Sequence, residues 1–144
     1  MVYLEEINPD NWRLGLKVSK EQEKYVSCDF RILARAYAYR NFRSKAFVIY
    51  SSSTPVGMAM YYDCDELKAY DFSQLFIDER YQGKGFGYAA ASKIIEMMKA
   101  DGKFNKAILC YIEGNESAKK LYEKIGFFCT GECDGDEIIM QMNF

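Results

Sequence analysis

A glycine-rich turn between an extended apolar segment and a helical segment constrains the fold of this sequence more than any other feature. Residues 67–77 have an extended pattern, Gln82-Gly83-Lys84-Gly85-Phe86-Gly87 forms the turn, and residues 85–99 have helical periodicity. Glycines at alternate positions leave backbone N–H groups uncovered just before the helix, where the helix dipole is positive. The sequence therefore predicts a strand, a turn and a helix arranged to bind an anionic group such as a pyrophosphate.

The strand before the turn alternates between two sets of side chains. One set contains Asp71, Ser73, Leu75 and Ile77, and the other contains Tyr70, Phe72, Gln74 and Phe76. Because successive side chains of a strand point to opposite faces, this pattern predicts one long strand with the two sets on opposite faces of a sheet. It places Asp71 on the same face as Ile77.

The remaining patterns predict alternating blocks of strands and helices. Strands are expected at residues 2–7, 46–50, 56–62, 107–112, 127–132 and 137–142, and further helices at 12–18, 19–26, 30–40 and 115–125. Ser19 and Gln22 have capping-box spacing at the start of one helix, and Asp134-Gly135 favours a hairpin turn. The order strand, helices, three strands, helix, strand, helix, two strands predicts an α/β fold with a mixed sheet, in one domain spanning residues 1–144.

Composition and charge exclude several classes of function. The chain has 144 residues, of which 49% are hydrophobic and 16% aromatic, enough for a packed core. Its net charge is −2 and its basic residues form no dense run, so nucleic-acid binding is not expected. No apolar run of transmembrane length and no signal peptide are present, so the expectation is a cytoplasmic protein that does not bind membranes.

The absence of histidine and the spacing of cysteine limit the chemistry. Five cysteines without any C-x-x-C pair indicate reduced thiols, and without histidine a zinc site would lack its usual ligands, so no metal is expected. Serine–histidine and cysteine–histidine nucleophile systems are excluded as well. A general base must be a carboxylate, a tyrosine, a cysteine, a lysine or an ordered water molecule.

A second motif follows the strand expected at residues 107–112. It reads Asn115, Ala118, Leu121, Tyr122, Gly126 and Phe127, spaced as N-x-x-A-x-x-L-Y-x-x-x-G-F. Together with the Q-x-x-G-x-G pattern of the glycine turn, it resembles the GCN5-related N-acetyltransferase (GNAT) superfamily over about residues 47–142. The resemblance implies a central mixed, mostly antiparallel sheet of six to seven strands flanked by about four helices. It also implies acetyl-CoA as co-substrate.

The resemblance assigns roles to individual residues. Tyr122 is expected to be the general acid that protonates the departing CoA thiolate, since the ordinary pKa of a phenol lies near that of a thiol. Asn115 is expected both to cap its helix and to bind the cofactor arm. Main-chain groups of Leu75, Phe76 and Ile77 are expected to bind the pantetheine arm and polarise the acetyl carbonyl. The other expected cofactor-binding residues are Gln82, Gly83, Lys84, Gly85, Phe86, Gly87 and Tyr88.

The general base is the least determined residue. Counted back from Gln82, Asp71 matches the position of the catalytic carboxylate in some members of the superfamily. Glu79 and Glu113 are alternatives, and many relatives use a chain of water molecules instead. Cys110 is not expected to carry the acetyl group, because cysteines within strands are usually inert and buried.

Within the superfamily, the chain looks most similar to bacterial spermine/spermidine (diamine) N-acetyltransferases. The stretches that carry this resemblance are residues 12–26, 77–85 and 131–137. It implies a small-molecule amine as partner, here a polyamine, with Glu21 and Asp29 as the expected substrate-binding carboxylates.

Other functions remain open alongside this one. A protein N-terminus, a lysine side chain and an aminoglycoside are alternative acceptors. A non-enzymatic acyl-CoA-binding module is the alternative to an enzyme, and Tyr122 argues against it. Homodimers are frequent in the superfamily, so a homodimer is the assembly that the resemblance suggests.

Overall fold

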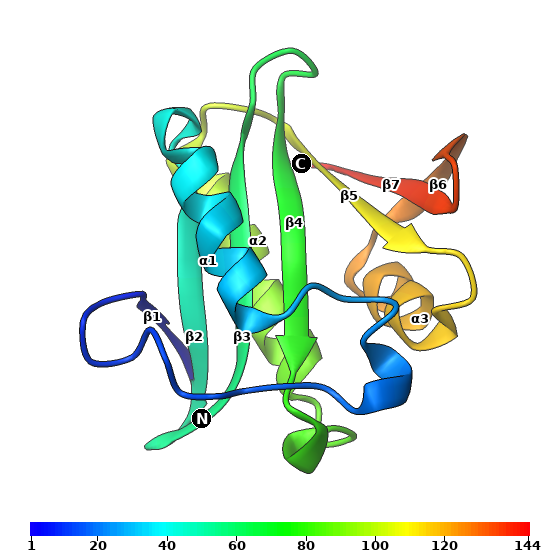
Figure 1. Cartoon of the computed structure of the whole chain (residues 1–144). Coiled ribbons are helices and arrows are strands. Elements are labelled where there is room, and N and C mark those ends of the chain that lie inside the picture. The colour runs from blue at the N-terminus through cyan, green and yellow to red at the C-terminus, as the bar shows by residue number, and fades with distance from the viewer.

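The computed structural model describes residues 1–144, which form seven strands and three α-helices (Figure 1). The strands are β1 (Val2–Glu6), β2 (Lys45–Ser51), β3 (Thr54–Cys64), β4 (Ala69–Ile77), β5 (Lys106–Ile112), β6 (Phe128–Asp134) and β7 (Glu137–Asn143). The helices are α1 (Asp29–Ala38), α2 (Phe86–Asp101) and α3 (Glu116–Ile125), with the 3₁₀-helices η1 (Lys20–Gln22), η2 (Arg40–Phe42) and η3 (Glu79–Tyr81). One sheet has the order β1-β2-β3-β4-β5-β7-β6, and all its neighbours are antiparallel except β4 and β5. The predicted mixed, mostly antiparallel sheet is thereby confirmed.

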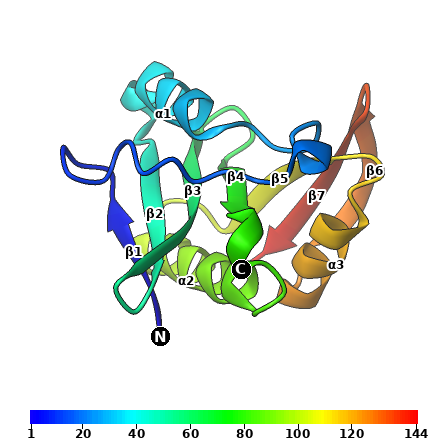
Figure 2. The same cartoon turned by 60° about the horizontal axis from the view of Figure 1, so that its bottom comes forward.

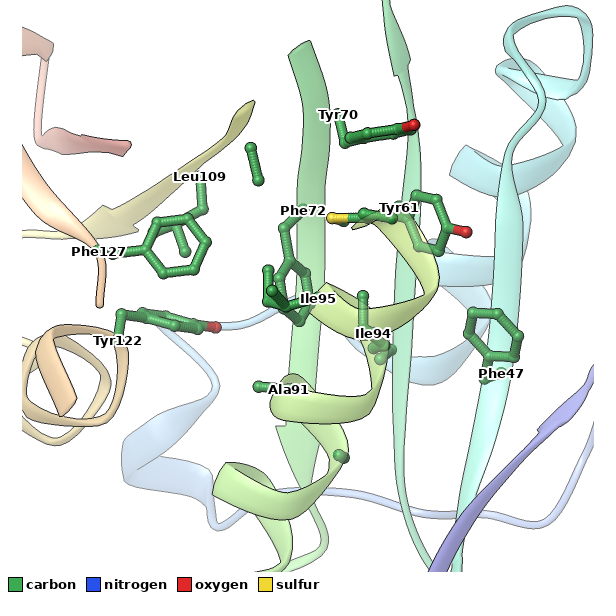
Figure 3. Close-up of a cluster of buried hydrophobic side chains, with 14 of the residues drawn as sticks. Phe47, Tyr61, Tyr70, Phe72, Ala91, Ile94, Ile95, Leu109, Tyr122 and Phe127 are labelled. Carbon is green, nitrogen blue, oxygen red and sulfur yellow. The ribbon is translucent and has the colours of Figure 1, made fainter. Parts of the chain in front are cut away.

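Helices cover both faces of the sheet, with α2 and α3 on one face and α1 on the other (Figure 2). On the α2 face, Ile94 and Ile95 belong to a core of 18 buried residues that also contains Phe72 of β4 and Tyr122 of α3 (Figure 3). On the α1 face, Ile32 belongs to a smaller core of seven buried residues that includes Phe76 of β4. Strand β4 is therefore held by both cores. No helix in the structure is both long and apolar enough to cross a membrane.

Strands β4 and β5 pair over a very short distance and then separate. Their parallel ladder contains only Tyr70 opposite Ala107 and Asp71 opposite Ile108. Beyond this point β5 turns away toward β7, while β4 continues to Ile77 (Figure 1). The last residues of β4 therefore have main-chain groups without a strand partner on the β5 side, and such groups are available to bind a ligand.

The strict alternation expected along β4 is wrong. Tyr62 of β3 pairs with Asp71, whereas Met60 pairs with Gln74, so β4 contains one residue more than β3 in this interval. An extra residue of this kind, a β-bulge, reverses the side to which the following side chains point. Asp71 consequently lies on the α1 face with Tyr62, while Ile77 packs on the α2 face.

The helices expected at residues 12–18 and 19–26 are also wrong, because only η1 is helical in this segment. Gly15 adopts a φ of +71°, which an α-helix does not allow. The main chain of Lys17 is bonded to residues that follow β4: its N–H donates to a carboxylate oxygen of Asp78 at 3.0 Å, and its carbonyl accepts from the N–H of Glu79 at 3.0 Å. Long-range bonds have replaced helical ones, and the segment crosses in front of the lower end of β4 (Figure 1).

Candidate active site

A cavity of about 280 Å³ lies at the free end of β4. Strand β4, the glycine turn, the start of α2 and the side of α3 form most of its wall. Every residue expected to bind the cofactor lines it, except Lys84. These lining residues are Leu75, Phe76, Ile77, Gln82, Gly83, Gly85, Phe86, Gly87, Tyr88 and Asn115. The expected acid Tyr122 lines the same cavity.

The glycine turn has the geometry of an anion site at a helix start. Gly83 and Gly85 have φ values of +76° and +83°, and a Cβ placed on either residue would meet no atom within 4 Å. Backbone conformation, not packing, therefore requires glycine at both positions. Gly85 is the N-cap of α2 and offers no side chain to bond the first N–H groups of the helix. Those donors, with the positive end of the helix dipole, are free for a phosphate.

Tyr122 is held rigidly with its hydroxyl at the cavity. The side chain is only 8% exposed, and its ring packs edge-on against Phe72 and Phe127, with centroids 6.1 and 5.9 Å away. The hydroxyl forms no hydrogen bond within the protein, yet every fully buried side-chain polar atom has a partner, so this oxygen is accessible from the cavity. Burial raises the pKa of Tyr122 above its ordinary value. The phenol therefore remains protonated at neutral pH and can donate a proton.

Two polar side chains of the cavity are already engaged within the protein. Asn115 is the N-cap of α3, and its Oδ1 accepts from the N–H of Ala118 at 3.3 Å, as the capping pattern predicted. The side-chain amide of Gln82 donates to the carbonyl of Ile77 at 2.8 Å and pairs with the side-chain amide of Gln22. Both residues therefore shape the cavity wall. The main-chain N–H of Asn115 donates to the carbonyl of Ile112 and its carbonyl accepts from Lys119, so its side-chain Nδ2 is the group left for a ligand, whereas Gln82 keeps its main-chain groups.

Asp71 lies outside this cavity, at the point where β4 and β5 separate. The hydroxyl of Tyr62 donates to Asp71 Oδ2 at 3.0 Å. Burial raises the pKa of Asp71 above its ordinary value, although the bond from Tyr62 and the nearby charge of Arg35 oppose the shift. The alternative carboxylates Glu79 and Glu113 are exposed and do not line the cavity that holds Tyr122.

A second cavity, of about 340 Å³, adjoins the first on the α1 side of β4. The two share Val18, Val26 and Phe76. The other residues of the second cavity are Lys17, Glu23, Ser27, Cys28 and Arg31. Glu21 and Asp29, the carboxylates expected to bind substrate, line neither cavity, although each is adjacent in sequence to a residue that does.

The structure adds several residues to the site that were not assigned from the sequence. Ala118 and Leu121 belong to the downstream motif, so their place on one helix face was a usable signal. The segment that crosses β4 contributes Val18, Gln22, Tyr25 and Val26. Its position depends on bonds to residues about 60 positions away, and no local pattern encodes such bonds.

Cys110 of β5 is unsuited to carry an acetyl group. Burial and the nearby carboxylates of Glu137 and Asp71 raise the pKa of its thiol to about 11. The reactive thiolate is therefore scarce at neutral pH. The raised pKa agrees with the expectation from the sequence that Cys110 is inert, but the expectation that it is buried is wrong, because the residue is exposed.

Comparisons with known proteins agree with this geometry. The model of the acetyltransferase (GNAT) family matches residues 4–127. The chain is 32% identical over 136 residues to the spermine/spermidine N(1)-acetyltransferase of Bacillus subtilis (strain 168), which covers 89% of this chain and 88% of that protein. A probable spermine N(1)-acetyltransferase of Bacillus subtilis subsp. natto (strain BEST195) is 30% identical over 136 residues, with the same coverage of 89% and 88%.

Solved structures share the fold at lower sequence identity. Spermidine N-acetyltransferase from Vibrio cholerae, in complex with CoA and spermine, has a TM-score of 0.79 and 18% identity, covering 99% of this chain and 95% of that one. The aminoglycoside acetyltransferase AAC(6′)-Ib, in complex with coenzyme A, has a TM-score of 0.81 and 16% identity, with coverage of 99% and 95%. The family match over most of the sequence and the relatives at 30% identity or more show that this chain belongs to the GNAT family of acetyltransferases.

Proposed function

We propose that the protein transfers an acetyl group from acetyl-CoA to a primary amine, with a polyamine such as spermidine or spermine as acceptor. The observation that carries the proposal is one cavity that joins three features: the free end of β4, the uncapped N-terminus of α2 and the hydroxyl of Tyr122. These features suit, in that order, the amide-bearing arm, the pyrophosphate and the sulfur of a CoA thioester. The amine acceptor rests on the relatives, which are named for spermine and spermidine.

The donor would lie along the wall formed by β4 and α2. The N–H groups at the start of α2 hold a pyrophosphate, with the cation of Lys84 nearby on the exposed turn. Main-chain groups of Leu75, Phe76 and Ile77 lack a β5 partner, so they bind an amide-bearing arm as an added strand would. Bound in this way, acetyl-CoA supplies a thioester carbonyl to the region between Phe76 and Tyr122.

Two groups of the chain would then assist direct attack by the amine. A main-chain N–H of β4 stabilises the negative charge that develops on the carbonyl oxygen. The hydroxyl of Tyr122 gives its proton to the sulfur as the carbon–sulfur bond breaks, and the second proton that the amine nitrogen loses after attack restores the phenol. No covalent enzyme intermediate is needed if donor and acceptor occupy the two adjoining cavities at the same time.

Asp71 is proposed as the carboxylate that receives the proton of the ammonium acceptor through water. It marks the point where the two strands separate, and its side chain lies on the α1 face, opposite the donor turn. A carboxylate whose pKa is raised by burial is a stronger base than an exposed one. Contact with the reacting atoms is not required, since ordered water can relay the proton.

Carboxylates on the α1 face beside this point would attract a polycation, although Arg35 also lies near Asp71. Asp71, Asp134 and Glu137 all act on the thiol of Cys110, so the three carboxylates surround one region of β4 to β7. Glu21 and Asp29 are proposed to add charge at the rim of the cavities, next to Gln22 and Cys28. Several carboxylates spread over one face suit a ligand with several ammonium groups.

One observation favours a second candidate acceptor. Lys17 and Arg31 line the second cavity and neither forms an ion pair there, while Glu23 is the single carboxylate of the lining. Two unpaired cations suit an amine that also carries a carboxylate, such as an amino acid.

A panel of acceptors separates these proposals. Thiol release from acetyl-CoA is measured with spermidine, spermine, amino acids, a lysine peptide, a peptide with a free N-terminus and an aminoglycoside. We expect kcat/KM for the polyamines to exceed the others by about tenfold or more. Turnover of another class alone would overturn the polyamine acceptor and keep the acetyltransferase. CoA binding without turnover of any amine would favour a non-enzymatic module.

A further inference from the structure

Gln22 and Gln82 form a reciprocal amide pair across 60 positions of sequence. Gln22 Nε2 donates to Gln82 Oε1 at 2.9 Å, and Gln82 Nε2 donates to Gln22 Oε1 at 3.0 Å. Gln82 Nε2 also donates to the carbonyl of Ile77, and Gln22 Oε1 also accepts from the N–H of Ser19 at 3.2 Å. The pair thus connects the last residue of β4, the first residue of the glycine turn and the start of η1.

The segment that Gln22 anchors is part of the donor cavity. Val18, Tyr25 and Val26 of this segment line the cavity opposite the residues of β4. The segment contains only three helical residues, so its position depends on long-range bonds. One anchor is the main chain of Lys17, bonded to residues that follow β4. Val18 and Val26 also pack on the α1-face core, and the amide pair is the hydrogen-bonded contact that reaches the glycine turn.

We propose that Gln22 is a positioning residue that holds residues 18–26 against the glycine turn and thereby forms the outer wall of the donor site. The inference rests on the proposed function in taking CoA as the ligand of that site. Gln22 does not touch the reacting atoms: its side chain fixes Gln82, whose turn presents the N–H groups that hold the pyrophosphate. Without the pair, the turn and the wall segment lose their common anchor, and CoA must order both.

Methionine substitutions test the pair without removing side-chain length. CoA affinity is measured by calorimetry for the wild type, Gln22→Met, Gln82→Met and the double variant. Because the net free-energy contribution of a hydrogen bond is modest, we expect Gln22→Met to raise the Kd for CoA about five- to tenfold. The double variant should bind at least about threefold better than the product of the single effects predicts, since the two residues share their bonds. Multiplicative effects, or a Gln22→Met affinity equal to wild type, would overturn the proposal.

Gln141→Met is the matched control. The Gln141 amide donates to Asn143 Oδ1 at 2.7 Å in an exposed bond, and neither residue lines a cavity, so its loss should leave CoA affinity unchanged. In steady-state assays, Gln22→Met should raise KM for acetyl-CoA while kcat stays within about twofold of wild type. A loss confined to kcat would contradict a positioning role.

Limited proteolysis tests the anchor without any ligand. Lys20 and Lys24 flank Gln22 and are exposed, so trypsin reports directly on this segment. We expect Gln82→Met to accelerate cleavage at these two sites severalfold, whereas Gln141→Met should not. Equal cleavage rates in the wild type, Gln82→Met and Gln141→Met would overturn the proposal. This readout is independent of the proposed function, which fails separately if wild-type protein binds CoA but acetylates no amine.

Discussion

Gly57 of β3 faces the main-chain carbonyl oxygen of Phe76 in β4 so closely that no Cβ fits between them. A methyl group at this position would also press on the side chain of Ile77, 2.9 Å away. The end of β4 is the wall along which we place the donor. Glycine at position 57 of the neighbouring strand β3 therefore allows the close approach of the β4 main chain along which we place the donor.

Gly57→Ala should destabilise the fold and weaken CoA binding. A backbone oxygen cannot move aside cheaply, so we expect a loss of about 1–3 kcal/mol in the free energy of unfolding, measured with urea. Gly87→Ala is the control for stability. Its Cβ would lie 3.6 Å from Ile77 and Leu121, an ordinary contact, and alanine in a helix should stabilise by up to about 1 kcal/mol. Equal effects of the two variants would contradict the close approach at Gly57.

Asp71→Asn should lower kcat/KM at neutral pH by about 100-fold, the lower end for loss of a general base. Asparagine keeps the acceptor for the Tyr62 hydroxyl, so the fold should be unaffected. Tyr62→Phe provides a second test of Asp71, through the pH dependence of the rate. It removes a bond that lowers the pKa of Asp71, so the acid limb of the pH–rate profile should move to higher pH. An Asp71→Asn enzyme with wild-type rates would exclude this residue as the base.

The advantage of Tyr122 over phenylalanine should be independent of pH across the physiological range. Burial raises the pKa of the phenol above its ordinary value of 10, so the proton-bearing form persists below that pH. The ratio of kcat between wild type and Tyr122→Phe should be constant from about pH 7 to pH 10. A ratio that declines with a midpoint near pH 8 would mean that the phenol ionises too early to serve as the acid.

Asp78 should contribute stability that is lost in acid. Burial alone would raise its pKa, but hydrogen bonds from Arg80 and from the N–H of Lys17 lower the pKa to about 2. Since the unfolded-state pKa is about 3.9, the contribution is present above that value and disappears as pH falls toward 2. Wild type should exceed Asp78→Asn by about 1–2 kcal/mol at pH 7, and urea unfolding should show the difference shrinking between pH 5 and pH 2. A difference that does not change with pH would assign the effect to packing.

The elements that carry local signals were predictable from the sequence. The glycines of the turn and the cap at Asn115 act within a few residues of themselves, so their patterns gave the start of α2 and of α3 correctly. The motif around Tyr122 added the fold family, because two separate patterns occurred in the right order. These residues form one side of the first cavity.

The remaining features depend on partners that are distant in sequence. Simple alternation along β4 predicted that Asp71 and Ile77 share a face. The bulge between them adds one residue, so Asp71 lies on the opposite face. Residues 12–26 were expected to form two helices from their local pattern and the capping box at Ser19, but only η1 is helical, and bonds to Asp78 and Gln82 fix the rest as turns and irregular chain. Glu21 and Asp29 were expected to bind a polyamine because of their charge and their place near the mouth of the site, but neither lines a cavity.

The most direct test of the central claim is the rate of acetyl transfer from acetyl-CoA to spermidine by wild type and Tyr122→Phe, measured as thiol release at saturating donor. The ring of the variant keeps its packing on Phe72 and Phe127, and only the hydroxyl at the cavity is lost. The account predicts that kcat falls by about 100-fold or more while CoA affinity and unfolding free energy stay unchanged. An unchanged kcat would remove Tyr122 as the acid and with it the assignment of chemistry to the end of β4.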